Sequence, residues 1–214
     1  MPFPMVHIFA AHELAEPLKI DALPQFYLGI LAPDAYWSRK ENNPEGRKIT
    51  HLAEGDEAGM RNRVLQFIHE HKNNNRKWFY TGYGIHILTD ILWENLVYKP
   101  FRENYSHGKT FSDSRPTYMS DMKMIDLWLY RNCNFRNDVW ALLSSAECFD
   151  TGLVTAREIE AERDLTLVWY DRKADQETGG YLYINPEKIT DFIQKASVEI
   201  YRLLSPVIFA GDES

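Results

Sequence analysis

The run TGYGIHILTDILWENLV, residues 81–97, decides the fold class of this chain. It is apolar at helical spacing and holds His86 and Asp90 four residues apart. Side chains at that spacing lie on one face of a helix, with Cβ atoms roughly 5 to 6 Å apart. Burying an imidazole and a carboxylate among isoleucines and leucines costs free energy unless each group finds a partner. The run therefore predicts a buried helix. In it, His86 and Asp90 either hydrogen-bond each other, bond an internal water or bind a metal ion.

Apolar residues recur at intervals of three and four in six segments of the chain. These segments are residues 56–72, 78–98, 117–132, 136–148, 155–171 and 187–204. Six helices leave little of the 214 residues for a sheet, so we expect an all-α, multi-helix bundle that forms a single domain over residues 1–214. Residues 175–186 (DQETGGYLYINP) break the pattern and predict a short irregular or extended excursion. The polar stretches 33–50 and 104–116 predict long loops.

Charge and composition exclude several classes of partner. A formal net charge of −7 argues against nucleic acid or an acidic membrane surface as the main partner. The one basic stretch reads as a solvated helix face. It contains Arg61, Arg63, His69, His71, Lys72, Arg76 and Lys77. No apolar run is long enough to cross a bilayer and the first residues lack a cationic head, so we expect a cytoplasmic protein. Oligomeric state is left open, including a homo-oligomer.

Both cysteines lack the spacing of a zinc or redox motif. Cys133 and Cys148 lie in segments that read as helical, and we expect both to be core thiols.

Three other segments place ligand-type side chains beside apolar residues. MVHIFAAHEL sets His7 on an apolar opening helix, FYLGILAPDAYW sets Asp34 after a proline, and KITHL sets His51 where a polar loop meets a helix. Taken singly, His7 could be a core histidine and Asp34 a turn or cap residue. His51 could be a surface histidine or a contact at a helix N-terminus. Taken with His86 and Asp90, they predict a buried metal site. Imidazole and carboxylate ligands together suit zinc or another divalent transition metal such as manganese, iron or nickel.

In this order and context the pieces resemble the bacterial zinc-dependent phospholipase C family, which is related in fold to the P1-type nucleases. The resemblance covers about residues 5 to 100 and rests on His7, LGILAPD (28–34), THL (50–52) and GYGIHILTD (82–90). It implies an all-helical metallohydrolase. It also implies that Asp34, His51, His86 and Asp90 surround one metal ion, and that Asp34 or Asp90 bridges to a second ion that His7 helps to hold.

The chain departs from that family in two places. It begins MPFPMV, whereas the secreted enzymes have a mature N-terminal tryptophan that binds metal. No histidine follows Asp90 on its helix, so the third zinc of the family is not expected. Glu94, Asp121 and Asp126 are conceivable acidic replacements, each with a surface or salt-bridge alternative. His12 falls off the stripe of His7, and His107 lies in a polar loop, so neither is expected to be a ligand.

Such a site suits hydrolysis of a phosphoester or phosphodiester, because two ions can activate a water and stabilise the attacking and leaving oxygens. The resemblance gives Asp34 the further role of orienting or deprotonating that water. A small phosphorylated substrate could be neutralised by cations of the 33–50 stretch and enclosed by nearby aromatic rings. These are Arg39, Lys40, Arg47 and Lys48, and Tyr36, Trp37 and Tyr83. The cationic side chains could equally be solvated loop charges.

Three alternatives remain beside the hydrolase. One is a metal-binding or ligand-sensing domain without turnover. Another is a helical interaction protein whose histidines and aspartates are core polar pairs. The third, an HD-type phosphohydrolase, needs an adjacent His-Asp pair, and the sequence has none.

Overall fold

The computed structural model describes residues 2–39, 44–105, 108, 110–173, 175–176 and 179–209, and in these ranges the chain is helical without a strand. The helix α5 (Lys77–Trp93) lies at the centre, and every residue from Trp78 to Trp93 is buried. A helix that is apolar around its whole circumference is stable only inside a core. The decisive run of the sequence is therefore the central helix, as predicted.

The closest helix packing joins α5 to α2 (Leu23–Leu31). Two glycines make this approach possible: a Cβ added to Gly29 would overlap the carbonyl of Phe79, and a Cβ added to Gly82 would overlap the carbonyl of Phe26. The two backbones can approach this closely only because neither glycine has a side chain. This crossing brings the end of α2 beside the middle of α5, where His86 lies.

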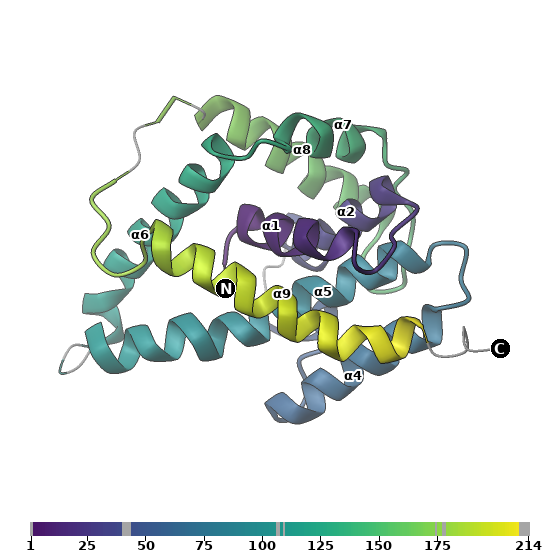
Figure 1. Ribbon diagram of the computed structural model, residues 1–214, viewed down its shortest axis with the longest axis horizontal. Helices are drawn as coiled ribbons and strands as arrows, with labels where there is room; N and C mark the ends of the chain where they lie inside the picture. The colour runs from purple at the N-terminus through teal and green to yellow at the C-terminus, as the bar shows by residue number, and fades with distance from the viewer. Residues whose placement is uncertain are drawn as a thin grey trace.

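The remaining helices surround this pair (Figure 1). The first helix, α1 (Pro4–Ala15), packs against α2 and α5 and is crossed by the long last helix, α9 (Pro186–Ile208). On one side lies α4 (Glu57–His71); on the other, α7 (Arg136–Ser145) and α8 (Ala156–Lys173) pack on α2. The helix α6 (Phe111–Arg131) contacts α1, α8 and α9. Their buried apolar side chains form a continuous core.

Several helix ends follow local sequence signals. Thr110 accepts from the amide of Asp113, whose carboxylate accepts from the Thr110 amide, forming a capping box before α6. Asp56 caps α4 and Asn185 caps α9. Prolines in the first turns of α1, α2 and α9 add a fixed φ where no helical hydrogen bond is lost.

The all-α prediction is confirmed for the described residues, and all six predicted helices are present with shifted ends. The loop prediction for 33–50 is wrong: η1 (Ala32–Ser38) is a tight helical segment, and α3 (Pro44–Thr50) is a short helix. The loop prediction for 104–116 is partly wrong, because the capping box starts α6 at Phe111 and the helix continues through Pro116. Wide helical turns, η2 (Glu94–Tyr98) and η3 (Phe101–Tyr105), precede it.

The excursion before α9 is irregular and contains no strand in its described part. It is fixed instead by Asp121 on α6, whose carboxylate accepts from the amides of Leu182, Tyr183 and Ile184 at 3.0, 2.6 and 2.8 Å. Asp121 is thus fully engaged in holding the chain and is not a metal ligand. Within the described part of the chain, no helix is both long enough and apolar enough to cross a bilayer.

Candidate metal centre

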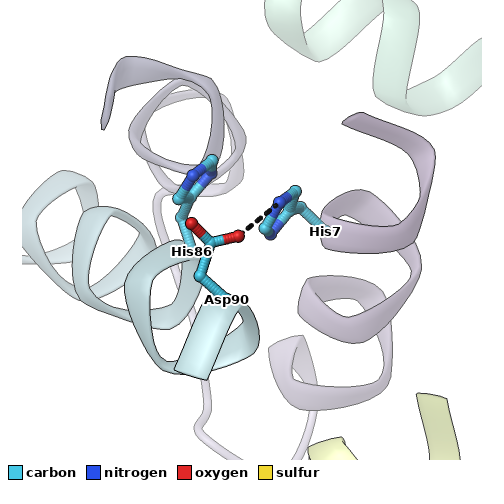
Figure 2. A group of neighbouring side chains, drawn as sticks. All are labelled: His7, His86 and Asp90. Atoms are coloured by element: carbon cyan, nitrogen blue, oxygen red, sulfur yellow. Dashed lines mark ion pairs between the residues drawn. The ribbon is translucent and has the colours of Figure 1, made fainter. Parts of the chain in front are cut away.

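All five predicted ligand residues meet in one place, although they come from four different elements. His7 lies on α1, Asp34 on η1, His51 directly after α3, and His86 and Asp90 on α5. The three histidines and Asp90 are buried, and the side chain of Asp34 is 17% exposed. Figure 2 shows His7 pointing from α1 toward His86 and Asp90. The packing of α1 and η1 against α5 therefore assembles what the sequence separates.

The nitrogen and oxygen atoms face one another at distances typical of ligands around one ion. His7 Nε2 lies 3.6 Å from Asp90 Oδ1, and His51 Nε2 lies 3.4 Å from Asp34 Oδ1 and 3.6 Å from Asp90 Oδ2. His86 Nε2 lies 3.9 Å from Asp34 Oδ2. Two ligand atoms about 2.0 to 2.1 Å from a tetrahedral zinc ion are about 3.3 to 3.4 Å apart. These contacts are long for hydrogen bonds but close to the edges of a coordination polyhedron.

Hydrogen bonds fix which nitrogen two of the histidines present. His86 Nδ1 lies 2.8 Å from the carbonyl of Ile30, which only accepts, so Nδ1 carries the proton. His51 Nδ1 lies 3.1 Å from the hydroxyl of Thr50, which donates its own proton to the carbonyl of Arg47. Both Nε2 atoms therefore turn lone pairs toward carboxylates and have no hydrogen-bond partner. A cation between them would satisfy both lone pairs, and an outer partner on Nδ1 is the usual arrangement of a metal-bound histidine.

The position of His51 depends on a strained turn. Leu52 adopts a left-handed backbone conformation with φ of 51°, which is unusual for a residue other than glycine. Arg63 on α4 donates to the carbonyl of Leu52 at 3.1 Å and holds this turn. Strain of this kind is concentrated at functional sites in proteins, where the surrounding structure maintains it.

The five residues form two overlapping triads: His7, His86 and Asp90, and Asp34, His51 and His86. Both triads need His86, yet its Nδ1 is occupied by Ile30 and only Nε2 is available. One nitrogen binds one ion, so only one triad can supply three ligands at a time. A second ion would have the two side chains outside that triad and the second oxygen of a bridging Asp34 or Asp90, and solvent or substrate would complete its shell.

The electrostatics of the cluster also favour a bound cation. Burial, and next the neighbouring His86, lower the pKa of His7 well below its usual value, and burial lowers the pKa of His86. Burial raises the pKa of Asp90 to about 6. Burial also disfavours ionised Asp34, but the adjacent His86, His51 and His7 outweigh it and lower the pKa of its carboxyl. Near pH 7 His7 and His86 are therefore neutral imidazoles and Asp34 and Asp90 are carboxylates, the protonation states that bind metal.

A cavity of about 300 Å³ opens onto the centre and is lined by His51 and Asp90. Arg47, one of the cations predicted to neutralise a substrate, lines this cavity, and its Nη2 lies 3.4 Å from Asp90 Oδ2. The lining also includes acidic groups, among them Glu57 and Glu94. Glu94, a conceivable replacement ligand, thus lies near the centre, but its side chain is exposed and it belongs to neither triad.

The other cations predicted to meet a substrate are engaged elsewhere. Arg39 binds Glu158 at 2.7 Å and the carbonyl of Leu153, so it joins η1 to α8. Lys48 pairs with Glu45 at the surface. Lys40 and His107 lie outside the described residues.

Two further residues weighed from the sequence are also structural. His12 hydrogen-bonds the Tyr27 hydroxyl and stacks on Phe135, as expected for a residue off the ligand stripe. Asp126 accepts from the amide of Met5 and from the hydroxyl of Tyr170, so it is not a replacement ligand.

The three aromatic residues predicted to enclose a substrate differ in their positions. Tyr36 is buried against His51, whereas the Trp37 side chain is largely exposed. Tyr83 donates to the carbonyl of Thr50 at 2.6 Å and so supports the turn before His51 rather than lining the cavity.

The two cysteines lie just outside the helices. Cys133 is buried, and Cys148 is partly buried beside Arg163. Both are free thiols. The core-thiol prediction is fully confirmed for Cys133 and only partly for Cys148.

One acidic residue near the site was missed. Burial, and next the charge of Asp34, raise the pKa of Glu162 on α8 to about 8. No local pattern pointed to Glu162, because it lies in a helix segment with Glu158 and Glu160, a composition typical of a solvated face. Only the packing of α8 on η1 brings this carboxyl toward Asp34.

Comparison of the chain with protein-family models, curated proteins and solved structures found no match.

Proposed function

We propose that this protein is a metal-dependent hydrolase of phosphoesters or phosphodiesters, with one or two divalent ions held by His7, Asp34, His51, His86 and Asp90. The observation that carries this proposal is the pair of Nε2 lone pairs, on His51 and His86, facing carboxylates in a buried cluster. The donor set suits zinc, and it also admits manganese, iron or nickel. The finer fold assignment, the phospholipase C and P1-nuclease arrangement, is part of the same proposal.

The proposed chemistry divides between the ion and the chain. A bound divalent ion supplies Lewis acidity and lowers the pKa of water toward neutrality. Asp34 is the most exposed member of the cluster, and it orients the attacking water by accepting its hydrogen bond. Its lowered pKa keeps the carboxylate ionised, which suits orientation and ligation better than storing a proton.

Arg47 favours an anionic substrate. Its guanidinium is 40% exposed at the cavity, so it can reach a ligand there while its inner edge neutralises Asp90. Arginine is well suited to phosphate oxygens because it offers donors in a planar fork. The cavity volume of about 300 Å³ matches a small phosphorylated molecule rather than a polymer.

One observation favours the second candidate function, a metal-binding or ligand-sensing domain without turnover. Asp56, Glu57 and Glu94 also line the cavity, and their charges repel a polyanion. A cavity with these charges admits small ligands of low charge more readily than a phosphate-rich substrate.

The test is metal content together with hydrolysis. Protein purified without chelator is analysed for bound metals and assayed with bis-p-nitrophenyl phosphate, beside His86→Ala and Asp90→Ala. His12→Ala serves as the control because His12 is a histidine outside the cluster. We expect at least one ion per chain and turnover in the wild type and the control, and loss of both in the two site variants.

Other outcomes separate the candidates. Bound metal without turnover of this or other phosphoesters favours the sensing domain. Absence of metal after reconstitution with zinc or manganese contradicts both candidates.

A further inference from the structure

The hydroxyl of Tyr36 is a buried polar group without a partner beside the metal centre. Tyr36 is 2% exposed, and its hydroxyl makes no hydrogen bond in the described structure. Its ring stands perpendicular to that of His51, with centroids 5.9 Å apart. A buried hydroxyl without a hydrogen bond destabilises the fold, so a position that served only packing would be better filled by phenylalanine.

The surroundings of this hydroxyl connect it to the centre rather than to the protein surface. Its ring stands against His51, and Asp34 lies on the same segment, η1. Both of these residues belong to the metal centre. A phenol is protonated at neutral pH, so the hydroxyl has one hydrogen to donate where the protein offers it no acceptor.

The backbone holds Tyr36 in this position. It lies two residues after Asp34 on η1, and the amide of Arg39 donates to its carbonyl at 3.0 Å. Arg39 is itself tied to Glu158 on α8. Tyr36 is thus held by the same segment that carries Asp34 before any ligand binds.

We propose that Tyr36 is a catalytic residue whose hydroxyl donates a hydrogen bond to an anionic oxygen of the ligand bound at the metal centre. This inference rests on the proposed function, because it requires an occupied metal site and an oxyanion ligand. The hydroxyl forms no covalent bond and transfers no proton. It supplies a prepared donor of the kind that stabilises negative charge on oxygen in a buried site.

The experiment uses Tyr36→Phe, which removes one oxygen and keeps the ring. Tyr27→Phe is the matched control, because Tyr27 is also buried but its hydroxyl already bonds His12. Inorganic phosphate is titrated calorimetrically into the zinc-loaded full-length proteins, and zinc content and thermal midpoint are recorded for each. Hydrolysis of bis-p-nitrophenyl phosphate is measured on the same samples.

We expect Tyr36→Phe to retain its zinc, to unfold at the same or a higher temperature, and to bind phosphate about 10-fold or more weakly, since a hydrogen bond to a charged group contributes about 1.5 to 3 kcal/mol. Tyr27→Phe should bind phosphate as the wild type does. Equal phosphate affinity in Tyr36→Phe overturns the proposal, as does failure of the zinc-loaded wild type to bind phosphate. Loss of zinc from Tyr36→Phe also overturns it, because the residue is then a ligand or a structural support.

The same experiment distinguishes the two proposals. If phosphate binding depends on Tyr36 but no phosphoester is hydrolysed, the hydrolase proposal fails and the role of Tyr36 in binding stands. If phosphate binding is independent of Tyr36 while hydrolysis is observed, the inference about Tyr36 fails alone. If the wild type binds no metal, both fail.

Discussion

The imidazole rings of His7 and His86 lie stacked and nearly parallel, with centroids 3.9 Å apart and an angle of 6° between their planes. Neither ring donates to the other, and neither nitrogen of His7 has a hydrogen-bond partner. Two protonated imidazoles would repel each other at this distance in a buried setting. The stack therefore excludes two protonated rings, and the neutral imidazole is the state that a metal ion selects.

The two triads should differ in affinity for zinc. His51 and His86 are both held by hydrogen bonds on Nδ1, whereas His7 is held by packing alone. We expect His86→Ala and His51→Ala to weaken zinc binding by about 100-fold or more, and His7→Ala by about 10-fold. Competition with a chromogenic chelator measures this order. A larger effect of His7→Ala than of His51→Ala would assign the tight ion to the other triad.

Thr50 should act on the metal through His51. Thr50→Val removes the acceptor of the His51 Nδ1 proton while keeping the side-chain shape. We expect zinc affinity to fall about 10-fold, because outer partners of ligand histidines typically contribute 10- to 100-fold. Thr89→Val is the control, since the buried hydroxyl of Thr89 bonds only the Ile85 carbonyl of its own helix. Equal zinc affinities in the two variants would contradict this role.

Removal of the charge of Asp90 should stabilise the metal-free protein. Asp90 is buried, its Oδ1 has no hydrogen bond, and its carboxylate faces other acceptors. Asp90→Asn removes a buried charge that the part-exposed Arg47 only partly offsets. The thermal midpoint in chelator should therefore rise, and added zinc should no longer raise it further. Asp121→Asn should have the opposite effect, because its carboxylate accepts three amides. Calorimetry with and without zinc tests both signs.

Asp126 should make stability depend on pH. Burial raises its pKa to about 7, above the value near 3.9 of an exposed aspartate. The unfolded chain therefore releases this proton first as pH rises, and the folded state loses about 1.4 kcal/mol of relative stability per pH unit between about 4 and 7.

Urea unfolding of Asp126→Asn between pH 4 and 8 tests this dependence. The variant should gain stability relative to the wild type as pH rises to about 7, and the difference should then level off. A difference that is constant across this range would show that Asp126 does not titrate with folding.

The helix crossing should tolerate no side chain at Gly82. A Cβ there would meet the backbone carbonyl of Phe26, which cannot move without separating α2 from α5. Gly84 also has no room, but its neighbour is the end of the flexible Ile68 side chain. We expect Gly82→Ala to destabilise the protein by several kcal/mol or to prevent folding, and Gly84→Ala to cost about 1 to 3 kcal/mol. Comparable losses in chemical denaturation would contradict this ranking.

Much of the fold could be predicted from periodicity because most helices bury one stripe of apolar residues. The exceptions had physical reasons. The helix α2 has only 9 residues, of which Phe26 to Leu31 are all buried, so the apolar spacing cannot be followed over several turns. The helical segments between 32 and 50 are short and begin with prolines or polar residues that also suit loops. The start of α6 depends on a capping box rather than on apolar spacing.

The identities of the ligand-type residues came from the sequence alone, because an imidazole or carboxylate inside an apolar segment needs a partner wherever the segment folds. His86 and Asp90 could even be placed on one helix face, since four residues of a helix fix their relation. What only the tertiary structure decided is how the other three side chains reach them. The crossing of α2 and α5 through Gly29 and Gly82 turns His86, the left-handed turn at Leu52 aims His51, and the packing of η1 brings in Asp34 and Tyr36. These relations join residues distant in sequence through backbone contacts, and no local pattern records such contacts.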